Sequence, residues 1–340
     1  MIAESTSQVT IEDLRLAGVM RTLRPALILV ALALLARPVR CEALIYWANF
    51  DNAFGSSVGI ANLDGSAYSP PSIGGASGPC GVAVDAEHVY WANYAPLGTP
   101  AIGRADLNGS DAMPSFFPTG GPPTCGVAVD GAHIFWANTG FLGTGTSIGR
   151  ADLDGNNPTT NFINGASGPC GVAVAGNYVY WANNATGTIQ RASVNDGTVD
   201  PNFLINAGPT PCGVAVDSSH VYWANTFGQS TIGRANLDGT GVVSNFIGGL
   251  PSPCGVTVDD GHIYWATVAG ASVGRADLDG GNVDDAFIST GSSPCGVAVL
   301  PPFKPVPVVS NHALLLVVAA LFAVAAIFLR GREGWQRDLL

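Results

Sequence analysis

One segment recurs six times along this chain, and the repeat limits the possible folds more than any other feature. Each copy contains Pro-Cys-Gly-Val-Ala-Val or a close variant, followed by a tetrapeptide similar to Tyr-Trp-Ala-Asn. The cysteine returns every 41 to 45 residues, at Cys80, Cys125, Cys170, Cys212, Cys254 and Cys295. A strand-rich repeat with a period of about 40–45 residues is typical of β-propeller blades. The sequence therefore indicates the fold more directly than the ligand.

Each repeat contains four short strand-like segments, A to D. Strand A is Gly-Val-Ala-Val, and strand B is His-Val-Tyr-Trp-Ala, which is rich in β-branched and aromatic residues. Strand C is represented by Ile102–Leu107, and an Asn-Gly or Asp-Gly hairpin turn leads into a short strand D such as Asn161–Ile163. Four antiparallel strands make one propeller blade.

The two ends of the repeat region predict how the ring closes. The region begins with a strand B, Leu44–Ala48, and finishes with a strand A, Cys295–Val299. Each strand B has a strand A in its own blade only if the last strand A of the chain completes the first blade. This closure removes exposed strand edges. We expect an all-β fold, a six-bladed β-propeller over residues 44–300 closed by a C-terminal strand A.

The N-terminal residues 1–43 are predicted to be an export signal. Arg21 and Arg24 precede the apolar stretch Pro25–Ala36, and small residues follow. A start at Met20 would give a conventional signal peptide. A membrane anchor is the alternative, but the apolar stretch is shorter than the roughly 20 residues that span a bilayer.

The C-terminal residues are predicted to tether the chain to a membrane. A proline-rich linker, 301–312, precedes Ala313–Leu329, an uncharged apolar run at the lower length limit for a transmembrane helix. The arginines of the tail, 330–340, favour a cytoplasmic end. We expect an exported propeller outside the cytoplasm; a buried soluble helix is the alternative.

The charge of the repeat region excludes one class of partner. Between Leu44 and Ser310 the chain has 19 Asp and Glu but only 6 Lys and Arg. Such a surface repels phosphate backbones, so we expect no nucleic-acid binding.

The repeats resemble the YWTD propellers of the low-density-lipoprotein-receptor class B type. The matching stretches are Tyr90–Asn93 on strand B, Ile102–Gly109 on strand C and Gly81–Asp85 on strand A. The final Asp of the family motif is Asn in five blades and Thr267 in the sixth. Members are mostly non-catalytic binding modules, and the resemblance implies a six-bladed fold over Leu44–Val299.

The C-terminus resembles a bacterial IPTL-CTERM or PEP-CTERM sorting signal. Val306–Ser310 stands where the family's short motif is expected, before the helix and the arginines. The resemblance implies processing of the helix and transfer to the cell surface. A plain membrane anchor is the alternative.

The six repeat cysteines begin strand A, which lies beside the central channel of a propeller, so we expect them to form a ring. An even number of cysteines in an exported protein favours disulfides between neighbouring blades. Buried free thiols and, less favoured, a thiolate metal site are the alternatives, because Cys-x-x-Cys spacing is absent. We assign no metal site.

Strand alternation sorts the connections onto two faces. The B-to-C loops vary most in length and carry aromatic residues, and aromatic residues on variable loops are candidates for a binding surface. The candidate binding residues are Phe50, Phe54, Tyr94, Phe141 and Phe227. The alternative is that these rings only cover the end of the propeller.

Other polar residues of the repeat are interpreted as structural. Repetition around the ring favours an architectural role for His88, His133, His220 and His262. The Asp-Leu-Asp-Gly turns at Asp152 and Asp277 raise a calcium alternative, although turn chemistry explains them, so we expect no cofactor. We also expect a structural pair within each blade between a strand C arginine, such as Arg234, and the aspartate that ends strand A.

Two functions agree with this pattern. The favoured one is an exported, membrane-tethered or surface-sorted, non-catalytic propeller that binds a protein or glycan. The alternative is an enzyme of the lactonase or lyase type with a site at the central channel. Glu87 is the only glutamate of the repeat region, and no nucleophile-elbow or zincin motif occurs, which favours binding.

Overall fold

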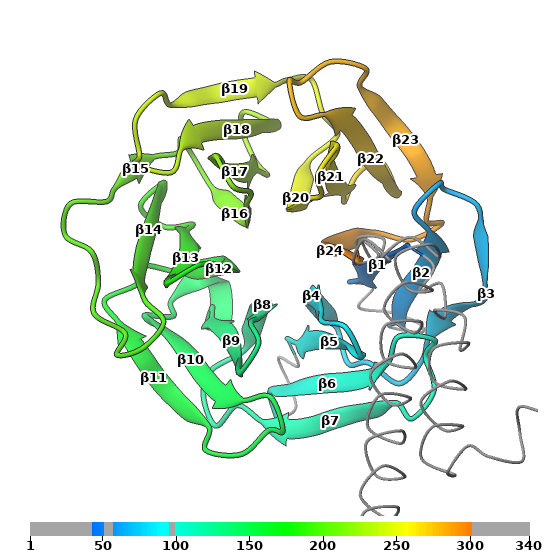
Figure 1. The fold of residues 1–340 in the computed structure, drawn as a ribbon, viewed down its shortest axis with the longest axis horizontal. Coiled ribbons are helices and arrows are strands. Elements are labelled where there is room, and N and C mark those ends of the chain that lie inside the picture. The colour runs from blue at the N-terminus through cyan, green and yellow to red at the C-terminus, as the bar shows by residue number, and fades with distance from the viewer. Residues whose placement is uncertain (1–42, 51–56, 95–98, 301–340) are drawn as a thin grey trace, which may run out of the picture. The chain divides into compact units, whose positions relative to one another are not determined.

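Six four-stranded antiparallel sheets form the part of the chain that the computed structural model describes, residues 43–50, 57–94 and 99–300 (Figure 1). Each sheet is one blade, with strand A innermost and strand D outermost. The predicted all-β six-bladed propeller is confirmed over the described residues.

Blades one to three each run from strand A beside the channel to strand D at the rim. Blade one consists of β24 (Pro294–Leu300), β1 (Leu44–Asn49), β2 (Ser57–Asn62) and β3 (Ala67–Ile73). Blade two consists of β4 (Pro79–Val84), β5 (His88–Asn93), β6 (Ala101–Asp106) and β7 (Met113–Pro118). Blade three consists of β8 (Thr124–Val129), β9 (His133–Asn138), β10 (Ser147–Asp152) and β11 (Thr159–Asn164), with a short 3₁₀ turn, η2 (Phe141–Gly143), between β9 and β10.

Blades four to six follow the same order. Blade four consists of β12 (Pro169–Ala175), β13 (Tyr178–Asn183), β14 (Thr188–Ser193) and the short β15 (Ile205–Asn206). Blade five consists of β16 (Pro211–Val216), β17 (His220–Asn225), β18 (Thr231–Asn236) and β19 (Val243–Ile247). Blade six consists of β20 (Pro253–Val258), β21 (His262–Thr267), β22 (Ser272–Asp277) and β23 (Asp284–Ser289).

Blade one contains strands from both ends of the repeat region. Its strand A, β24, pairs antiparallel with β1, and Leu44 lies opposite Leu300 while Ile45 lies opposite Val299. The predicted signal segment 1–43, apart from residue 43, the predicted linker 301–312, the apolar run 313–329 predicted to be a transmembrane helix and the predicted tail 330–340 lie outside the described residues. Within the described ranges no helix has the length and apolarity needed to cross a membrane.

The hydrophobic core is divided among the seams between neighbouring blades. At the seam between blades one and two, Tyr46 and Ile73 pack with Val89 and Trp91. The seam between blades six and one contains Ile45 and Trp47 with Tyr264 and Val273 of the other blade. The strand B tryptophans are almost wholly removed from water, and a buried side chain of this size contributes strongly to stability. Each blade is therefore stabilised by its two neighbours.

The strand C arginines fasten one blade to the next. Arg234 stacks over the ring of Phe246 in its own blade, 3.9 Å from the ring centroid, and donates to the carbonyl oxygen of Leu278 in blade six at 3.2 Å. Arg150 and Arg191 make the same interblade bond, to the carbonyls of Val194 and Leu237.

The predicted pairing of these arginines with the aspartates that end strand A is wrong. Among the described residues no ion pair joins the two sets, and the aspartates instead accept hydrogen bonds from tyrosine hydroxyls and turn amides, as Asp217 does from Tyr222 at 2.9 Å and from the amide of His220. Arg191 does form an ion pair, at 2.8 Å, but with Asp200 of the connection before β15. Carboxylate oxygens already bonded inside the hairpin leave the guanidinium to bind the neighbouring blade.

Candidate functional site

The propeller has two faces that differ in chemistry. The loop face is made of the B-to-C and D-to-A connections: residues 50, 74–78, 94, 99–100, 119–123, 139–146, 165–168, 184–187, 207–210, 226–230, 248–252, 268–271 and 290–293. The turn face is made of the A-to-B and C-to-D turns: residues 63–66, 85–87, 107–112, 130–132, 153–158, 176–177, 194–204, 217–219, 237–242, 259–261 and 278–283.

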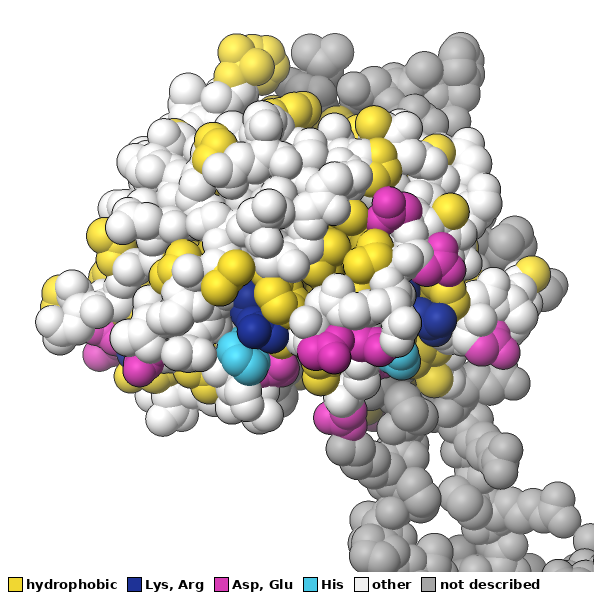
Figure 2. Space-filling view, turned by 90° about the horizontal axis from the view of Figure 1, so that it is seen from above, with side chains coloured by type: hydrophobic (Ala, Val, Ile, Leu, Met, Phe, Trp, Pro, Cys, Tyr) yellow, Lys and Arg dark blue, Asp and Glu magenta, His cyan; other side chains and the backbone are white. Residues whose placement is uncertain are grey.

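The described part of the loop face carries no Asp, Glu, Lys, Arg or His. Every described charged residue belongs to the turn face or to a strand. In Figure 2 the charged and histidine side chains gather toward one side of the described molecule, and much of the opposite side is white and yellow. Among the described residues, the charged side chains are thus separated from the loops of this face.

The acidic turns of the turn face are held by short hydrogen bonds. The backbone and side chain of Asn156 donate to Asp154, and these bonds hold the pKa of Asp154 below its usual value. The carboxylates raised as a calcium alternative are bonded locally as well, since Asn157 donates to Asp152 at 2.8 Å and Asn282 donates to Asp277 at 2.7 Å. Turn geometry accounts for these contacts.

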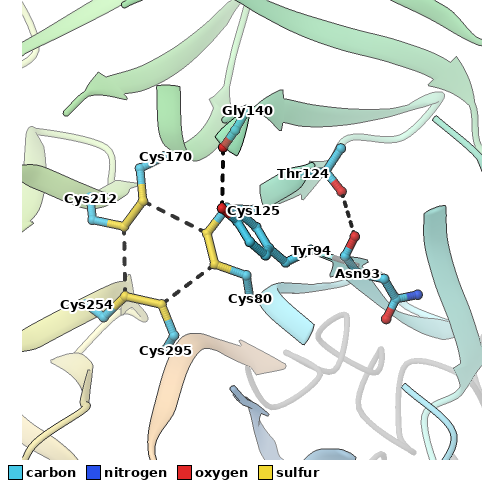
Figure 3. Close-up of a disulfide and its surroundings, with 10 residues drawn as sticks. All are labelled: Cys80, Asn93, Tyr94, Thr124, Cys125, Gly140, Cys170, Cys212, Cys254 and Cys295. Atoms are coloured by element: carbon cyan, nitrogen blue, oxygen red, sulfur yellow. Dashed lines mark hydrogen bonds between the residues drawn. A yellow bond between two sulfur atoms is a disulfide. The ribbon is translucent and has the colours of Figure 1, made fainter. Parts of the chain in front are cut away.

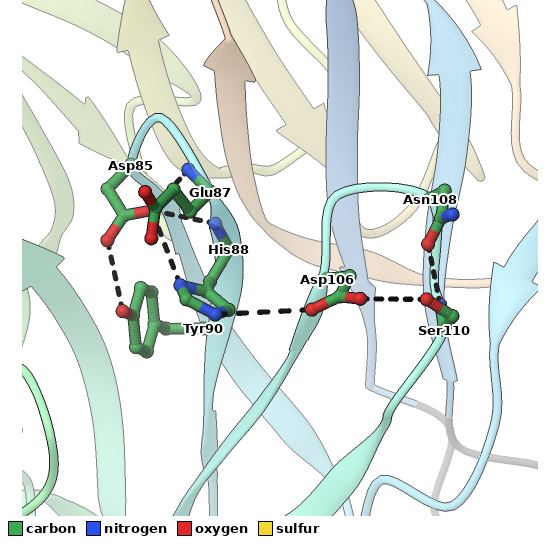
Figure 4. A network of polar contacts seen from close by, with 7 residues as sticks. All are labelled: Asp85, Glu87, His88, Tyr90, Asp106, Asn108 and Ser110. Carbon is green, nitrogen blue, oxygen red and sulfur yellow. Dashed lines mark hydrogen bonds and ion pairs between the residues drawn. The ribbon is translucent and has the colours of Figure 1, made fainter.

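The four repeated histidines lie within hairpin networks on the turn-face side. In blade two, His88 Nδ1 is 3.8 Å from Asp85 and its Nε2 is 4.0 Å from Asp106 (Figure 4). Asp85 also accepts from the hydroxyl of Tyr90 at 3.0 Å. His133, His220 and His262 face the equivalent aspartates of their blades. The repetition agrees with the architectural role predicted for them.

The six repeat cysteines form a ring of sulfur atoms around the channel at the end nearer the loop face (Figure 3). In the structure they are joined as Cys80–Cys125, Cys170–Cys212 and Cys254–Cys295, with Cα–Cα distances of 4.8, 4.9 and 5.0 Å. Each disulfide links strand A of one blade to strand A of the next. Of the alternatives that the sequence left open, this is the interblade disulfide arrangement.

Glycines directly after these cysteines allow the innermost strands to approach. A Cβ atom on Gly213 would lie 2.6 Å from the carbonyl oxygen of Cys254, and one on Gly296 would lie 2.6 Å from that of Cys80. Real Cβ atoms do not approach backbone so closely. The Cys-Gly pair therefore sets the width of the channel as well as the position of the sulfurs.

Two of the five candidate binding residues cover the ring rather than face solvent. Phe50 and Tyr94 pack against the cysteines, and their rings meet edge to face with centroids 5.7 Å apart. The hydroxyl of Tyr94 donates to the carbonyl oxygen of Gly140 at 3.4 Å, so the cover reaches blade three.

The remaining candidates occupy different positions. Phe141 and Phe227 are 61% and 66% exposed on the loop face. Phe54 lies outside the described residues. Leu142, beside Phe141, is 84% exposed; because it is not aromatic, the aromatic pattern of the loops does not select it. Phe141, Leu142 and Phe227 thus expose apolar surface on a part of the loop face where the described residues carry no charge.

The channel offers little chemistry for catalysis. Below the cysteine ring, a cavity of about 200 Å³ is lined by the alternating Val and Ala of the innermost strands, with Thr257 in one blade. No ionisable group other than the cysteines lines the channel among the described residues. The groups close enough to share a metal ion in these ranges also consist of ring cysteines alone.

Comparison with known proteins places the chain by its fold. No protein-family model matches it, and no curated protein matches it. Among solved structures, the chain is similar to one from a crystal structure of a nidogen/laminin complex, with a TM-score of 0.61 and 21% sequence identity. The match covers 76% of this chain and 98% of the other. At this identity the likeness shows the propeller fold alone.

Proposed function

We propose that this protein is an exported, non-catalytic binding module of the YWTD propeller type that recognises a partner protein or glycan through its loop face. The observation that carries the proposal is that the described part of the loop face has no charged side chain and exposes Phe141, Leu142 and Phe227. The solved structure similar to this chain comes from a protein–protein complex, which supports a protein partner. The channel, which among the described residues is lined by no ionisable side chain other than the cysteines, gives no comparable support to a lactonase or lyase.

Export is part of the same proposal. Disulfides persist in oxidising compartments outside the cytoplasm, and the propeller contains three. The apolar segments before and after the repeats are the proposed signal and the proposed membrane tether or sorting signal, with Ala313–Leu329 as the membrane contact.

The test places a photo-crosslinking amino acid at Phe141, at Phe227 or, as a control on the turn face, at Val242, which is 42% exposed. Each purified protein is incubated with cells of the source organism and irradiated, and the adducts are identified by mass spectrometry. We expect the same partner at the first two positions and none at the control position.

Salt provides a second arm of this test. Exposed charges attract a partner less as salt rises, whereas apolar contacts do not weaken. We expect binding to persist at about 1 M salt, where the Debye length is about 3 Å. Equal crosslinking at Val242, or binding abolished by salt, would overturn the proposal.

A further inference from the structure

The sulfur ring contains a second complete set of neighbours. Each sulfur is bonded to one adjacent sulfur and lies in contact with the other. The non-bonded contacts are Cys125–Cys170 at 3.9 Å, Cys212–Cys254 at 3.8 Å and Cys80–Cys295 at 3.8 Å (Figure 3). Each of the six ring cysteines therefore has two neighbouring partners, and the six can be joined into three neighbouring pairs in two ways.

We propose that the ring has two disulfide registers and that a small thiol interconverts them without unfolding the propeller. The first register is the one in the structure, which links blades two and three, four and five, and six and one. The second register joins Cys125 to Cys170, Cys212 to Cys254, and Cys80 to Cys295. It links blades three and four, five and six, and one and two.

The exchange proceeds in balanced steps around the ring. A thiolate RS⁻ attacks Cys80, forms a mixed disulfide and releases the thiolate of Cys125. Cys125 attacks Cys170 and releases Cys212. Thiol–disulfide exchange of this kind transfers one sulfur–sulfur bond at each attack.

The remaining steps return the small thiol. Cys212 attacks Cys254 and releases Cys295, which then attacks Cys80 and expels RS⁻. Four sulfur–sulfur bonds form and four break, counting the mixed disulfide that forms and breaks within the cycle; three ring disulfides replace three others, no electron is gained or lost, and the small thiol acts as a catalyst. Each of the three internal attacks crosses one of the three non-bonded contacts.

The strands themselves need not move far during the exchange. The bonded pairs already have Cα–Cα distances of 4.8–5.0 Å, within the usual disulfide range, and the glycine contacts repeat around the ring at the same strand position. The cysteines are 5–8% exposed and line a small cavity in the channel. A small thiol without other charged groups suits this narrow channel, because no described side chain lining it carries a charge that would pair with one.

The sequence supplies a direct way to read the register. Arg104, Arg150, Arg191, Arg234 and Arg275 separate the six cysteines, so trypsin places each on its own peptide. Cys41 shares a peptide with Cys80 and is replaced by serine in every sample, Cys41→Ser.

The full-length protein is incubated anaerobically with catalytic 2-mercaptoethanol, quenched with acid, alkylated and digested, and the linked peptides are identified by mass spectrometry. We expect the pairs Cys125–Cys170, Cys212–Cys254 and Cys80–Cys295 to appear with time, and omission of the thiol to prevent their appearance. Persistence of the original pairs alone would overturn the proposal. So would pairs that skip a neighbour, such as Cys80–Cys170, because these require unfolding.

Two matched double variants give an independent reading. Cys80→Ser/Cys295→Ser removes one sulfur from each of two disulfides, whereas Cys80→Ser/Cys125→Ser removes one whole disulfide. Both are equilibrated with 2-mercaptoethanol and its disulfide, which serves as the oxidant. We expect no free ring thiol in either variant, because the first adopts the second register. Two free thiols in the first variant and none in the control would show that the register is fixed.

Discussion

At the scale of single residues, the arginine of strand C explains how blades are joined. The guanidinium of Arg234, for example, lies over the ring of Phe246 on strand D and also donates across the seam to the next blade. Blade one has Ile60 at this position, and there the hydroxyl of Tyr46 donates to the carbonyl oxygen of Leu107 in blade two at 2.7 Å. The seam thus keeps a polar bond although the side chain that supplies it changes.

Replacement of this arginine tests the interblade role. Arg234→Ala removes the stacking contact and the charged hydrogen bond, and we expect the free energy of unfolding to fall by about 2 kcal/mol. Arg234→Lys should recover only part of the lost stability, because the lysine ammonium is not planar and cannot stack on the ring of Phe246 as the guanidinium does. Chemical denaturation measures both, with Met113→Ala, at a partly exposed strand D position, as the control. An unchanged midpoint in Arg234→Ala would contradict the role.

The tyrosines of strand B predict a limit to stability at high pH. Burial first, and then the hydrogen bond to Asp217 and its charge, raise the pKa of Tyr222, and Tyr90 and Tyr264 are raised likewise. The folded state therefore favours the protonated phenol. Its contribution is complete below the unfolded pKa of about 10 and is lost as pH rises toward the folded value.

Denaturation midpoints measured between about pH 8 and pH 11 check this expectation. Wild type should lose stability above about pH 10, and Tyr222→Phe should lose less over the same interval because it has one fewer phenol to ionise. Parallel curves for the two proteins would show that Tyr222 is not one of the groups responsible.

At the scale of strands and blades, the Cys-Gly pair of strand A determines how closely the blades converge. Gly213→Ala should lower the free energy of unfolding by about 3 kcal/mol, because the new methyl group meets the backbone of Cys254 and Gly255 rather than a side chain that can rotate. Gly131→Ala is the matched control, since a Cβ there meets nothing within 4 Å. Comparable midpoints for the two variants would exclude backbone contact as the constraint.

The sequence predicted the blades well because each strand carries its own pattern. It predicted the partner of the arginines poorly, since arginine and aspartate recur together whereas a neighbouring carbonyl has no sequence signature. Blade four shows a second limit: Gln190 replaces the strand C glycine, and its side chain accepts from Asn183 at 2.7 Å. The outer strand there, β15, shrinks to Ile205–Asn206, and no local motif indicates this change.

The candidate site was predicted in part. The period of the repeat placed the cysteines in a ring, but their spacing could not distinguish thiols from disulfides. Loop length and aromatic content selected Phe141 and Phe227, which are exposed, and equally selected Phe50 and Tyr94, which are packed on the ring. Local sequence cannot separate these two situations, because the difference depends on whether the ring meets the cysteines and another aromatic ring in the fold, as Phe50 and Tyr94 do.

At the scale of the whole molecule, the disulfides connect distant parts of the chain through loops with sequence separations of 45, 42 and 41 residues. In the chain-entropy account, closing a loop of this length stabilises the folded state by about 4 kcal/mol. We expect Cys170→Ser/Cys212→Ser to lose about this amount and wild type to unfold at lower temperature under reductant. The unreduced, denatured protein should weigh about 6 Da less than the reduced protein, since each disulfide replaces two thiol hydrogens. A full thiol mass would contradict the pairing.

Closure of the six blades also affects how the molecule comes apart. In an open row of repeats the end unit can detach by breaking one interface, whereas the first unit to leave a ring must break two. Loss of the first blade from the ring therefore costs two interfaces. Each later blade costs only one, so we expect a ring that has lost one blade to unfold quickly. The disulfides also join the blades in covalent pairs, so we expect the ring to open first at the seams without a disulfide, between blades one and two, three and four, and five and six. The propeller is thus expected to unfold as three covalently linked blade pairs within one chain.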